Sequence, residues 1–311
     1  MQLHHRLGWP FMPGEKYFGR GVAPEHLRIG SDGSVKIRLA GDWVAFARSL
    51  TNLGEVVTTT TNHAVSLVQT SRYPEFKFCP CGQSACSVDC GLGFHFPAWS
   101  EVWAWRRLQD DGIWHMLCIQ GPDGTASHQI VLHPSAGEQN FRNLVEQFRP
   151  ASPAISPLLM ASRRPHEIPG NHDRLEWFKQ RKFSFVENPH NGCRQVHRES
   201  FPDLWQNVMA ERLRLGTTIV TAPVLHSLSW QPLAFKIQAG GFSASSNEVL
   251  FQCQLKSVAE LWVVPLSTEE NAPLALEAYD VDDALLFALA APADRANTWL
   301  ELLAWLPSAQ Y

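Results

Sequence analysis

The stretch GNHD, at residues 170–173, places a histidine where it could bind a metal ion or a cofactor. Metallophosphoesterases use the same four letters in binding two metal ions, but their sites need further Asp and His ligands from several loops. Here GDWV at Gly41 has no second Asp at the right spacing, and no GHxH sequence follows. Two interpretations of His172 then remain: a polar residue in the first turn of a helix that Asn171 or Asp173 caps, or the ligand of another group.

Four cysteines lie close together in the stretch FCPCGQSACSVDCG, with the spacing CxCx4Cx3C. Four such thiolates can complete a tetrahedral zinc site or hold an iron–sulfur cluster, although this spacing matches no standard pattern closely. The Cys-Pro dipeptide at its start is also associated with thiolate binding of haem, and the same thiols could instead be inert or sensitive to oxidation. The predicted metal is zinc, and its predicted ligands are Cys79, Cys81, Cys86 and Cys90.

Composition places the chain among ordinary globular proteins. It has 311 residues, 45% of them apolar, and a net charge of −4, which argues against the basic surface of a general nucleic-acid binder. The first residues lack the apolar segment of a secretory signal, and no apolar run reaches the roughly 18 residues needed to span a membrane. We therefore expect a cytoplasmic protein with no membrane or nucleic-acid partner. Its seven cysteines should be reduced thiols or metal ligands.

The two halves of the chain resemble each other at a constant offset of 159 residues, from a segment beginning at Glu101 to one beginning at Glu260. An ungapped run of matches in one order indicates duplication. Five prolines in residues 150–169 separate the halves and predict a linker. We divide the chain into 1–150, an N-terminal repeat with a helical entry, and 151–311, the linker with the C-terminal repeat. The matched pairs are Trp103/Trp262, Leu117/Leu276, Asp123/Asp282, Ile130/Leu289 and Leu144/Leu303.

Each half predicts the same series of elements. A strand with a tryptophan comes first, a second strand forms a hairpin with a third through GPDG or DVDD, and an amphipathic helix ends the unit. In the first half the helix has apolar residues at i, i+3, i+4 and i+7, namely Phe141, Leu144, Val145 and Phe148. This order predicts an α+β fold, a tandem duplication of an antiparallel β-sheet domain with flanking helices. The predicted strands are 101–106, 114–120 and 128–132, then 260–264, 274–280 and 284–289.

The order and spacing of these segments resemble the HemS/ChuS-type cytoplasmic haem-utilisation proteins, often called hemin-degrading factors, over most of the chain. GVAPEHLRIG…IRLAGDWVAFARSLTNLGEV is similar to the helical entry of that family. MLCIQGPDGTASHQIVLHP and ELWVV…LALEAYDVDDALLFAL are similar to its two hairpins. The resemblance implies two tandem HemS-like domains and a haem-binding protein of haem-iron acquisition.

The resemblance also implies a role for His172. The family's axial haem ligand is a histidine that follows the linker and begins a helix, and GNHDRLEWFKQRKF fits that place, with Gly170 where an acidic residue is usual. Imidazole is a common ligand of haem iron, and cationic side chains suit the propionates. The same cations could instead lie on a solvated helix face. The predicted cofactor-binding residues are His172, Arg174, Lys179, Arg181 and Lys182, with His166, Arg163 and Arg164 of the linker at the mouth of the site.

The sequence does not decide whether haem is carried or degraded. The family's distal arginine aligns with Phe94, beside His95, so oxidative opening of the porphyrin with external electrons and dioxygen is less well supported than binding. His63 and His226 are expected at equivalent positions of the two repeats, with a shared structural role. The expected partners are haem and a haem-receiving or electron-donating protein, for a monomer or a homodimer. The alternative is a non-haem scaffold or a metal-thiolate sensor that kept the HemS-like fold.

Overall fold

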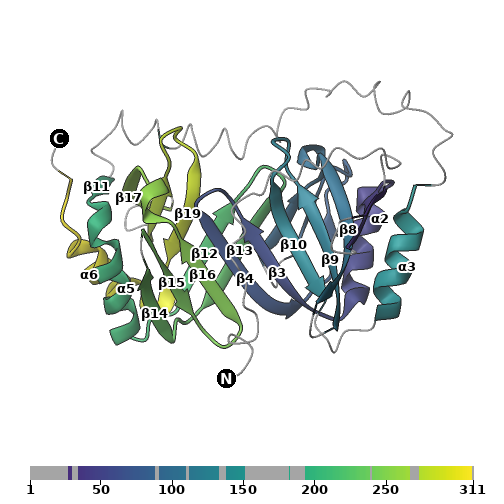
Figure 1. Cartoon of the computed structure of the whole chain (residues 1–311). Helices are drawn as coiled ribbons and strands as arrows, with labels where there is room; N and C mark the ends of the chain where they lie inside the picture. Colours follow the sequence, from purple (N-terminus) through teal and green to yellow (C-terminus); the bar gives the residue numbers. More distant parts are fainter. Residues whose placement is uncertain are drawn as a thin grey trace.

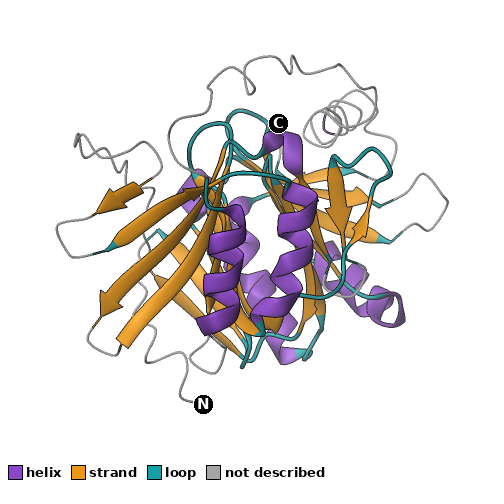
Figure 2. Ribbon diagram, turned by 90° about the vertical axis from the view of Figure 1, so that its right-hand side faces the viewer, coloured by secondary structure: helices purple, strands orange, loops and turns teal. Residues whose placement is uncertain are grey.

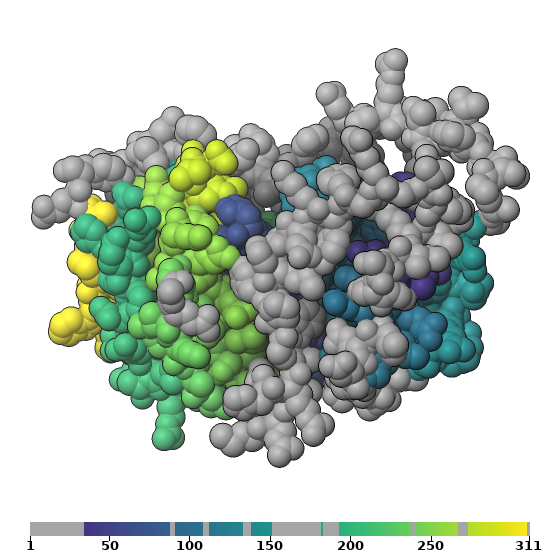
Figure 3. All heavy atoms as spheres, in the orientation of Figure 1, coloured from purple at the N-terminus to yellow at the C-terminus, as the bar shows by residue number. Residues whose placement is uncertain are grey.

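The computed structural model contains two antiparallel β-sheets and few helices, which confirms the predicted α+β fold. The strands fill the centre of the molecule and the helices lie at its two ends (Figure 1). The N-terminal and C-terminal repeats occupy opposite sides of the molecule (Figure 3). The structure describes residues 27–29, 34–87, 91–109, 112–132, 138–150, 182, 193–238, 240–266 and 273–309.

The N-terminal repeat is built mainly from strands. The runs EVVTTTT and VSLVQTSR are rich in β-branched residues, which favour extended backbone, and they form the hairpin β3–β4. Asp42 caps the first helix by accepting a hydrogen bond of 2.8 Å from the backbone N–H of Val44. The elements are β1 (Leu27–Ile29), β2 (Val35–Leu39), α2 (Trp43–Ser49), η1 (Leu50–Leu53), β3 (Glu55–Thr61), β4 (Val65–Arg72), β5 (Lys77–Phe78), β6 (Ser84–Cys86), β7 (Leu92–His95), η2 (Phe96–Ala98), β8 (Glu101–Gln109), β9 (Gly112–Gln120), β10 (Ala126–Leu132) and α3 (Glu138–Phe148).

The C-terminal repeat follows the same order. Its first long helix has Pro202 in the first turn, where the missing N–H costs nothing. The elements are β11 (Arg194–Val196), η5 (Arg198–Ser200), α5 (Phe201–Ala210), β12 (Leu215–Val220), β13 (Val224–Trp230), β14 (Ala234–Gln238), β15 (Gly241–Ser245), β16 (Val249–Cys253), η6 (Leu255–Ser257), β17 (Glu260–Pro265), β18 (Leu274–Tyr279), β19 (Leu285–Ala290), η7 (Ala293–Arg295) and α6 (Ala296–Ala304).

The registers of the strands confirm the repeat. Leu117 lies opposite Ala104 in the N-terminal repeat. In the C-terminal repeat Leu276 lies opposite Val263. These two residues follow Leu117 and Ala104 by 159 positions each. The tryptophan of the first hairpin strand donates its indole N–H to the glutamate two residues earlier in both repeats, at 2.8 Å and 2.7 Å. The second and third strands also share the same bulge, because their pairing shifts at equivalent residues. The duplication therefore preserves backbone geometry as well as sequence pattern.

The predicted turns GPDG and DVDD close the β9–β10 and β18–β19 hairpins in equivalent ways. Gly124 and Asp283 occupy the same place in the two turns, with φ of 75° and 61°. Glycine adopts this left-handed region without strain, and aspartate is among the few other residues that tolerate it. The turn therefore fixes where the Asp283 carboxylate stands.

Each sheet takes strands from both repeats. The first sheet has the order β1-β2-β8-β9-β10-β3-β4-β16-β15-β14, and the second has β11-β17-β18-β19-β12-β13-β7-β6-β5. Strands β14–β16 of the C-terminal repeat are thus joined to β4, and strands β5–β7 of the N-terminal repeat are joined to β13. The division of the chain at residue 150 stays a proposal about its sequence repeats, since the hydrogen-bonded sheets extend across both halves.

Two large apolar cores lie between the sheets and the end helices. The predicted apolar face of α3, Phe141, Leu144, Val145 and Phe148, is buried as expected. Viewed from the end that carries α2 and α3, the two helices stand side by side with strands spreading apart on either side (Figure 2). Within the described residues, no helix combines the length and the apolar character required to cross a bilayer.

Candidate functional site

A buried group of polar side chains lies where the two repeats meet, and we call it the central polar cluster: Thr60, Gln69, Tyr73, His128 and His226. The Thr60 hydroxyl lies 2.8 Å from Nδ1 of His128 and 2.9 Å from Nδ1 of His226. It therefore joins one imidazole of each repeat. Both imidazoles are almost fully excluded from solvent, and buried polar groups cost free energy unless their hydrogen bonds are made.

One arrangement of protons satisfies every member of the cluster. Oε1 of Gln69 only accepts, so Nε2 of His226, 3.2 Å away, donates to it. Nδ1 of His226 then accepts from the Thr60 hydroxyl, and this hydroxyl accepts from Nδ1–H of His128. Nε2 of His128 is left as the acceptor for the Tyr73 hydroxyl, at 2.5 Å. Both imidazoles are neutral in this chain of hydrogen bonds, which runs from one repeat to the other.

Burial keeps the two imidazoles neutral. Loss of solvent, together with a smaller effect of the neighbouring His226, lowers the pKa of His128 from 6.5 to about 3. Burial likewise lowers the pKa of His226 to about 4. Each nitrogen of both rings already has a hydrogen-bond partner. Neither imidazole is therefore free to bind a metal ion without breaking the cluster.

Lys182 is the one residue of the predicted haem site that lies within the described residues. Its ammonium group lies 2.9 Å from Glu260, also pairs with Asp283, and sits 5.3 Å above the ring of Tyr279. Burial alone would lower the pKa of Lys182, but the hydrogen bonds and charges of Asp283 and Glu260 outweigh it and raise the pKa. The lysine is therefore held by one carboxylate of β17 and one of the β18–β19 turn.

The other predicted cofactor-binding residues lie outside the described residues. They are His166, His172, Arg174, Lys179 and Arg181, together with Arg163 and Arg164. Their assignment stays a prediction.

The cysteine stretch forms the loop between β5 and β6. Sγ of Cys79 lies 2.6 Å from Sγ of Cys81, while Cys86 stands on β6. Within the described ranges, no group of three or more His, Cys, Asp or Glu side chains is arranged to hold a metal ion. Cys90 lies outside those ranges. The predicted zinc site therefore finds no support among the three cysteines that the structure describes.

His63 and His226 were expected at equivalent positions, and this is wrong. Leu67 lies opposite Thr60, and His226 lies opposite Ile219. Because Thr60 and Ile219 are equivalent in the two repeats, Leu67 is the counterpart of His226. His63 instead lies in the β3–β4 turn and pairs with Asp280 at 3.3 Å. The match between the two segments rested on the shared letters LG and H, and it departed from the constant offset of 159 residues.

Phe94, the residue aligned with the family's distal arginine, packs in the N-terminal core with 2% of its surface exposed. Its ring centre lies 5.8 Å from that of His128. Phe94 thus helps to enclose the central polar cluster.

Another imidazole outside the predicted site, that of His115, lines a cavity of about 610 Å³ between the first sheet and α3. His115 is 6% exposed, and neither ring nitrogen makes a hydrogen bond, although Nε2 lies 3.5 Å from a carboxylate oxygen of Glu138. Burial lowers the pKa of His115. Arg106 and Arg142 lie at the same cavity. A neutral imidazole with free nitrogens is a possible ligand group, so His115 serves as an internal comparison for His172.

Alternation along the strands could have identified His115 and His128. His115 shares a strand face with Leu117 and Ile119, and His128 shares one with Ile130 and Leu132, because every second residue points the same way. Their apolar companions predict burial. The partner of His128 in the other repeat could not be found this way, since it depends on how strands 166 residues apart in sequence approach.

No protein-family model matches the chain, and neither does any curated protein sequence. Solved structures do match its fold. Holo-PhuS, a heme-binding protein from Pseudomonas aeruginosa, has a TM-score of 0.71 at 18% identity, over 91% of this chain and 89% of PhuS. ChuS, an E. coli heme oxygenase, has a TM-score of 0.73 at 13% identity, over 90% of each chain. These likenesses confirm the predicted HemS-like fold with its two repeats, while the ligand must be argued from chemistry.

Proposed function

We propose that this protein binds haem through an axial histidine, His172, and handles it in haem-iron acquisition. The observation that carries the proposal is the likeness in fold to a heme-binding protein and a heme oxygenase over about nine tenths of the chain. Both repeats are included in that likeness, so it extends to the arrangement of the two halves around the linker. The sequence places a histidine followed by basic residues directly after this linker.

The chemistry of this segment suits a porphyrin. A neutral imidazole is a common proximal ligand of haem iron, and His172 is followed closely by Arg174, Lys179 and Arg181. Guanidinium groups pair well with carboxylates such as the propionates of haem. His166 lies six residues before His172 and is proposed at the mouth of the site.

We propose that Lys182 anchors the segment that contains His172. It follows His172 by ten residues, and its ammonium group is shared by Glu260 and Asp283. Because both carboxylates already neutralise this cation, we assign it the anchoring of the segment. The other basic residues of the segment would then pair with the haem propionates. The face to which Lys182 is attached carries the buried side chains of Trp262, Val264 and Tyr279.

Bound haem would supply redox chemistry at its iron, and the protein would supply binding and orientation. The partners proposed for this function are haem itself and a cytoplasmic protein that receives haem or donates electrons. The central polar cluster is no part of the proposed haem site, because its imidazoles are fully hydrogen-bonded.

A hemin titration tests the proposal. We expect the full-length protein to bind one hemin with a shifted Soret band that persists after gel filtration. Addition of an electron donor in air then separates the two uses of haem: a stable Soret band indicates delivery, and bleaching indicates degradation. His115→Leu, which removes the other candidate imidazole, should bind hemin as the wild type does. If the wild-type protein gives no saturable Soret shift, or if His115→Leu alone abolishes it, the proposal is wrong.

A further inference from the structure

We propose that Cys79 and Cys81 form a reversible dithiol–disulfide pair that is oxidised by a low-molecular-weight disulfide. The pair lies at the exposed end of the β5–β6 hairpin and is separate from the proposed haem ligand. The proposal concerns a modification site and does not depend on haem binding.

The hairpin turn brings the two sulfurs together. The carbonyl oxygen of Cys79 accepts a hydrogen bond of 2.8 Å from the N–H of Gly82, which closes a β-turn with Pro80 and Cys81 at its centre. Proline at the second position favours such a turn because its φ is already set. The sulfurs of Cys79 and Cys81 lie 2.6 Å apart, so a shift of roughly half an ångström reaches disulfide bonding distance. The backbone therefore positions the pair before any oxidation.

The equivalent hairpin of the C-terminal repeat shows that this loop is an addition. The β5–β6 hairpin encloses residues 79–84 between its paired positions Phe78 and Ala85. The β14–β15 hairpin encloses only 238–241 between Ile237 and Phe242. A shorter turn is thus sufficient for the fold, and the two additional residues of the N-terminal repeat accommodate the Cys-Pro-Cys segment.

Both members of the pair are accessible to an oxidant from solvent. Cys79 is partly exposed and Cys81 is exposed. The thiolate is the reactive form of cysteine. When Cys79 reacts, the sulfur of Cys81 is close enough to complete the disulfide.

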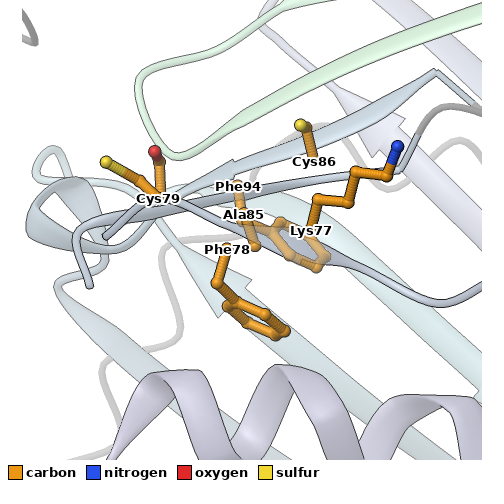
Figure 4. A pocket seen from close by; sticks show the side chains of 7 residues that line it. Lys77, Phe78, Cys79, Ala85, Cys86 and Phe94 are labelled. Atoms are coloured by element: carbon orange, nitrogen blue, oxygen red, sulfur yellow. The ribbon is translucent and has the colours of Figure 1, made fainter. Parts of the chain in front are cut away.

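Cys86 lies apart from this pair and provides a matched control. It lies opposite Lys77 on the neighbouring strand, whereas the N–H of Cys79 donates to the carbonyl oxygen of Ser84. Figure 4 shows Cys79 and Cys86 at separate places around a cavity of about 220 Å³. Cys86 is exposed like Cys81, so it reports general thiol reactivity without the paired geometry.

The reaction balances in two exchange steps. The Cys79 thiolate attacks one sulfur of the oxidant, a bond forms between them, and the oxidant's other sulfur leaves as a thiolate. The Cys81 thiol then loses its proton, attacks the Cys79 sulfur, and releases the second oxidant thiolate. The protein loses two electrons and two protons, and the oxidant becomes two thiols.

Cys118 and Cys253 should take no part. Burial raises the pKa of both Cys118 and Cys253 to about 12, so these thiols hold very little thiolate at neutral pH. Disulfide formation is therefore expected at the hairpin turn, and the core should be spared.

Oxidised and reduced glutathione are the probes for the test. The reduced full-length protein is equilibrated in glutathione buffers of increasing oxidising strength, alkylated, and analysed by fragmentation mass spectrometry. We expect a Cys79–Cys81 disulfide that a reductant reverses, that Cys79→Ser and Cys81→Ser both abolish, and that Cys86→Ser leaves unchanged. Alkylation of Cys79 should be at least about tenfold faster than that of Cys118. Cys81→Ser should instead trap glutathione on Cys79, since no neighbouring thiol can release it.

Several results would overturn the proposal. In the first, Cys79 and Cys81 stay open to alkylation in the most oxidising buffer. In the second, the disulfide found joins either cysteine to Cys86. In the third, the thiols of the purified protein are protected until a chelator removes a stoichiometric metal ion, which would make the pair part of a metal site.

Discussion

His128 and Phe287 stand at the same place in the two repeats, on strands that share one bulge, yet their surroundings are opposite in character. His128 is hydrogen-bonded to Thr60 and Tyr73. Phe287 lies opposite Ile219 and packs against the rings of Phe201 and Phe251 in the C-terminal apolar core. The same backbone geometry therefore accommodates either a hydrogen-bonded polar group or an apolar core at this position. The fold itself does not require the polar group, whose burial costs free energy unless every hydrogen bond is made.

The difference between the two cores concerns a side-chain contact between the repeats. In the N-terminal repeat Thr60 reaches His226 of the other repeat, whereas the equivalent residue Ile219 has no polar group to offer. His226 in turn has Leu67 as its counterpart. The molecule is therefore asymmetric at its centre, because Thr60 joins the two repeats through its side chain and Ile219 does not. This contact adds to the strand pairs β4–β16 and β7–β13, which already join the repeats.

The largest expected effect is on stability in acid. Because the folded pKa values of His128 and His226, about 3 and about 4, lie below the unfolded value of 6.5, the unfolded chain binds more protons between these limits. The free energy of unfolding should therefore be highest above pH 6.5 and fall as the pH drops to about 4, by up to about 1.4 kcal/mol per pH unit for each imidazole. Urea unfolding followed by tryptophan fluorescence at several pH values measures this slope.

The control replaces each histidine by its counterpart in the other repeat, as His128→Phe with His226→Leu. In this variant the free energy of unfolding should depend on pH much less steeply between pH 6.5 and about 4 than in the wild type. An equal slope in the two proteins would show that the central polar cluster does not carry the acid sensitivity.

Phe287→His places an imidazole in the apolar surroundings of the C-terminal repeat. The counterpart of Thr60 at this place is Ile219, whose side chain offers no hydrogen bond, so we expect a loss of about 3 kcal/mol or more in the free energy of unfolding. The matched control, Ile219→Val, removes one methylene and should cost only about 1 kcal/mol. Similar losses in both variants would mean that the two cores do not differ in polarity as described.

Tyr73→Phe removes one end of the hydrogen-bonded chain and leaves Nε2 of His128 without its donor. The expected cost is about 1–2 kcal/mol. A double-mutant cycle with His226→Leu should be non-additive by at least about 0.5 kcal/mol, because Thr60 connects the two ends. Strict additivity would contradict a connected cluster.

Asp283→Gly should have the smallest effect, because glycine already occupies this position in the N-terminal repeat and adopts its positive φ. It removes one carboxylate from Lys182 while Glu260 remains. We expect a loss of at most about 1 kcal/mol, since the Asp283 side chain is half exposed. The loss should shrink at high salt. Asp283→Asn, which keeps the backbone preference and removes the charge, should behave alike, and a loss that is independent of salt would exclude the ion pair as its cause.

Local patterns in the sequence predicted much of the fold. The helix ending at Phe148 has its predicted apolar face, and the predicted strand from Glu101 was extended only at its end, to Gln109. The offset of 159 residues was sufficient to pair the repeats, because a duplicated hairpin keeps its register. The exchange of β5–β7 and β14–β16 between sheets was not predictable, since nothing local in those strands distinguishes one sheet edge from the other.

The candidate site was less accessible to sequence reasoning. The sequence could propose His172 because this histidine and its basic neighbours are adjacent in sequence. The central polar cluster draws Thr60, His128 and His226 from three separate strands, so their meeting depends on tertiary packing alone. The charge of Lys182 predicts a propionate partner, whereas its pairing with the carboxylates of Glu260 and Asp283 could not be predicted because these residues are distant in sequence.

The most direct test of the central claim compares hemin binding by the wild-type protein with that by His172→Ala and by the double variant His166→Ala/His172→Ala. Soret titrations should show a shifted or missing band and weaker binding for His172→Ala, and the strongest loss for the double variant. His63→Ala, which removes an exposed histidine paired with Asp280, should match the wild type. Unchanged hemin spectrum and affinity in the double variant would contradict the assignment of His172 as the haem ligand.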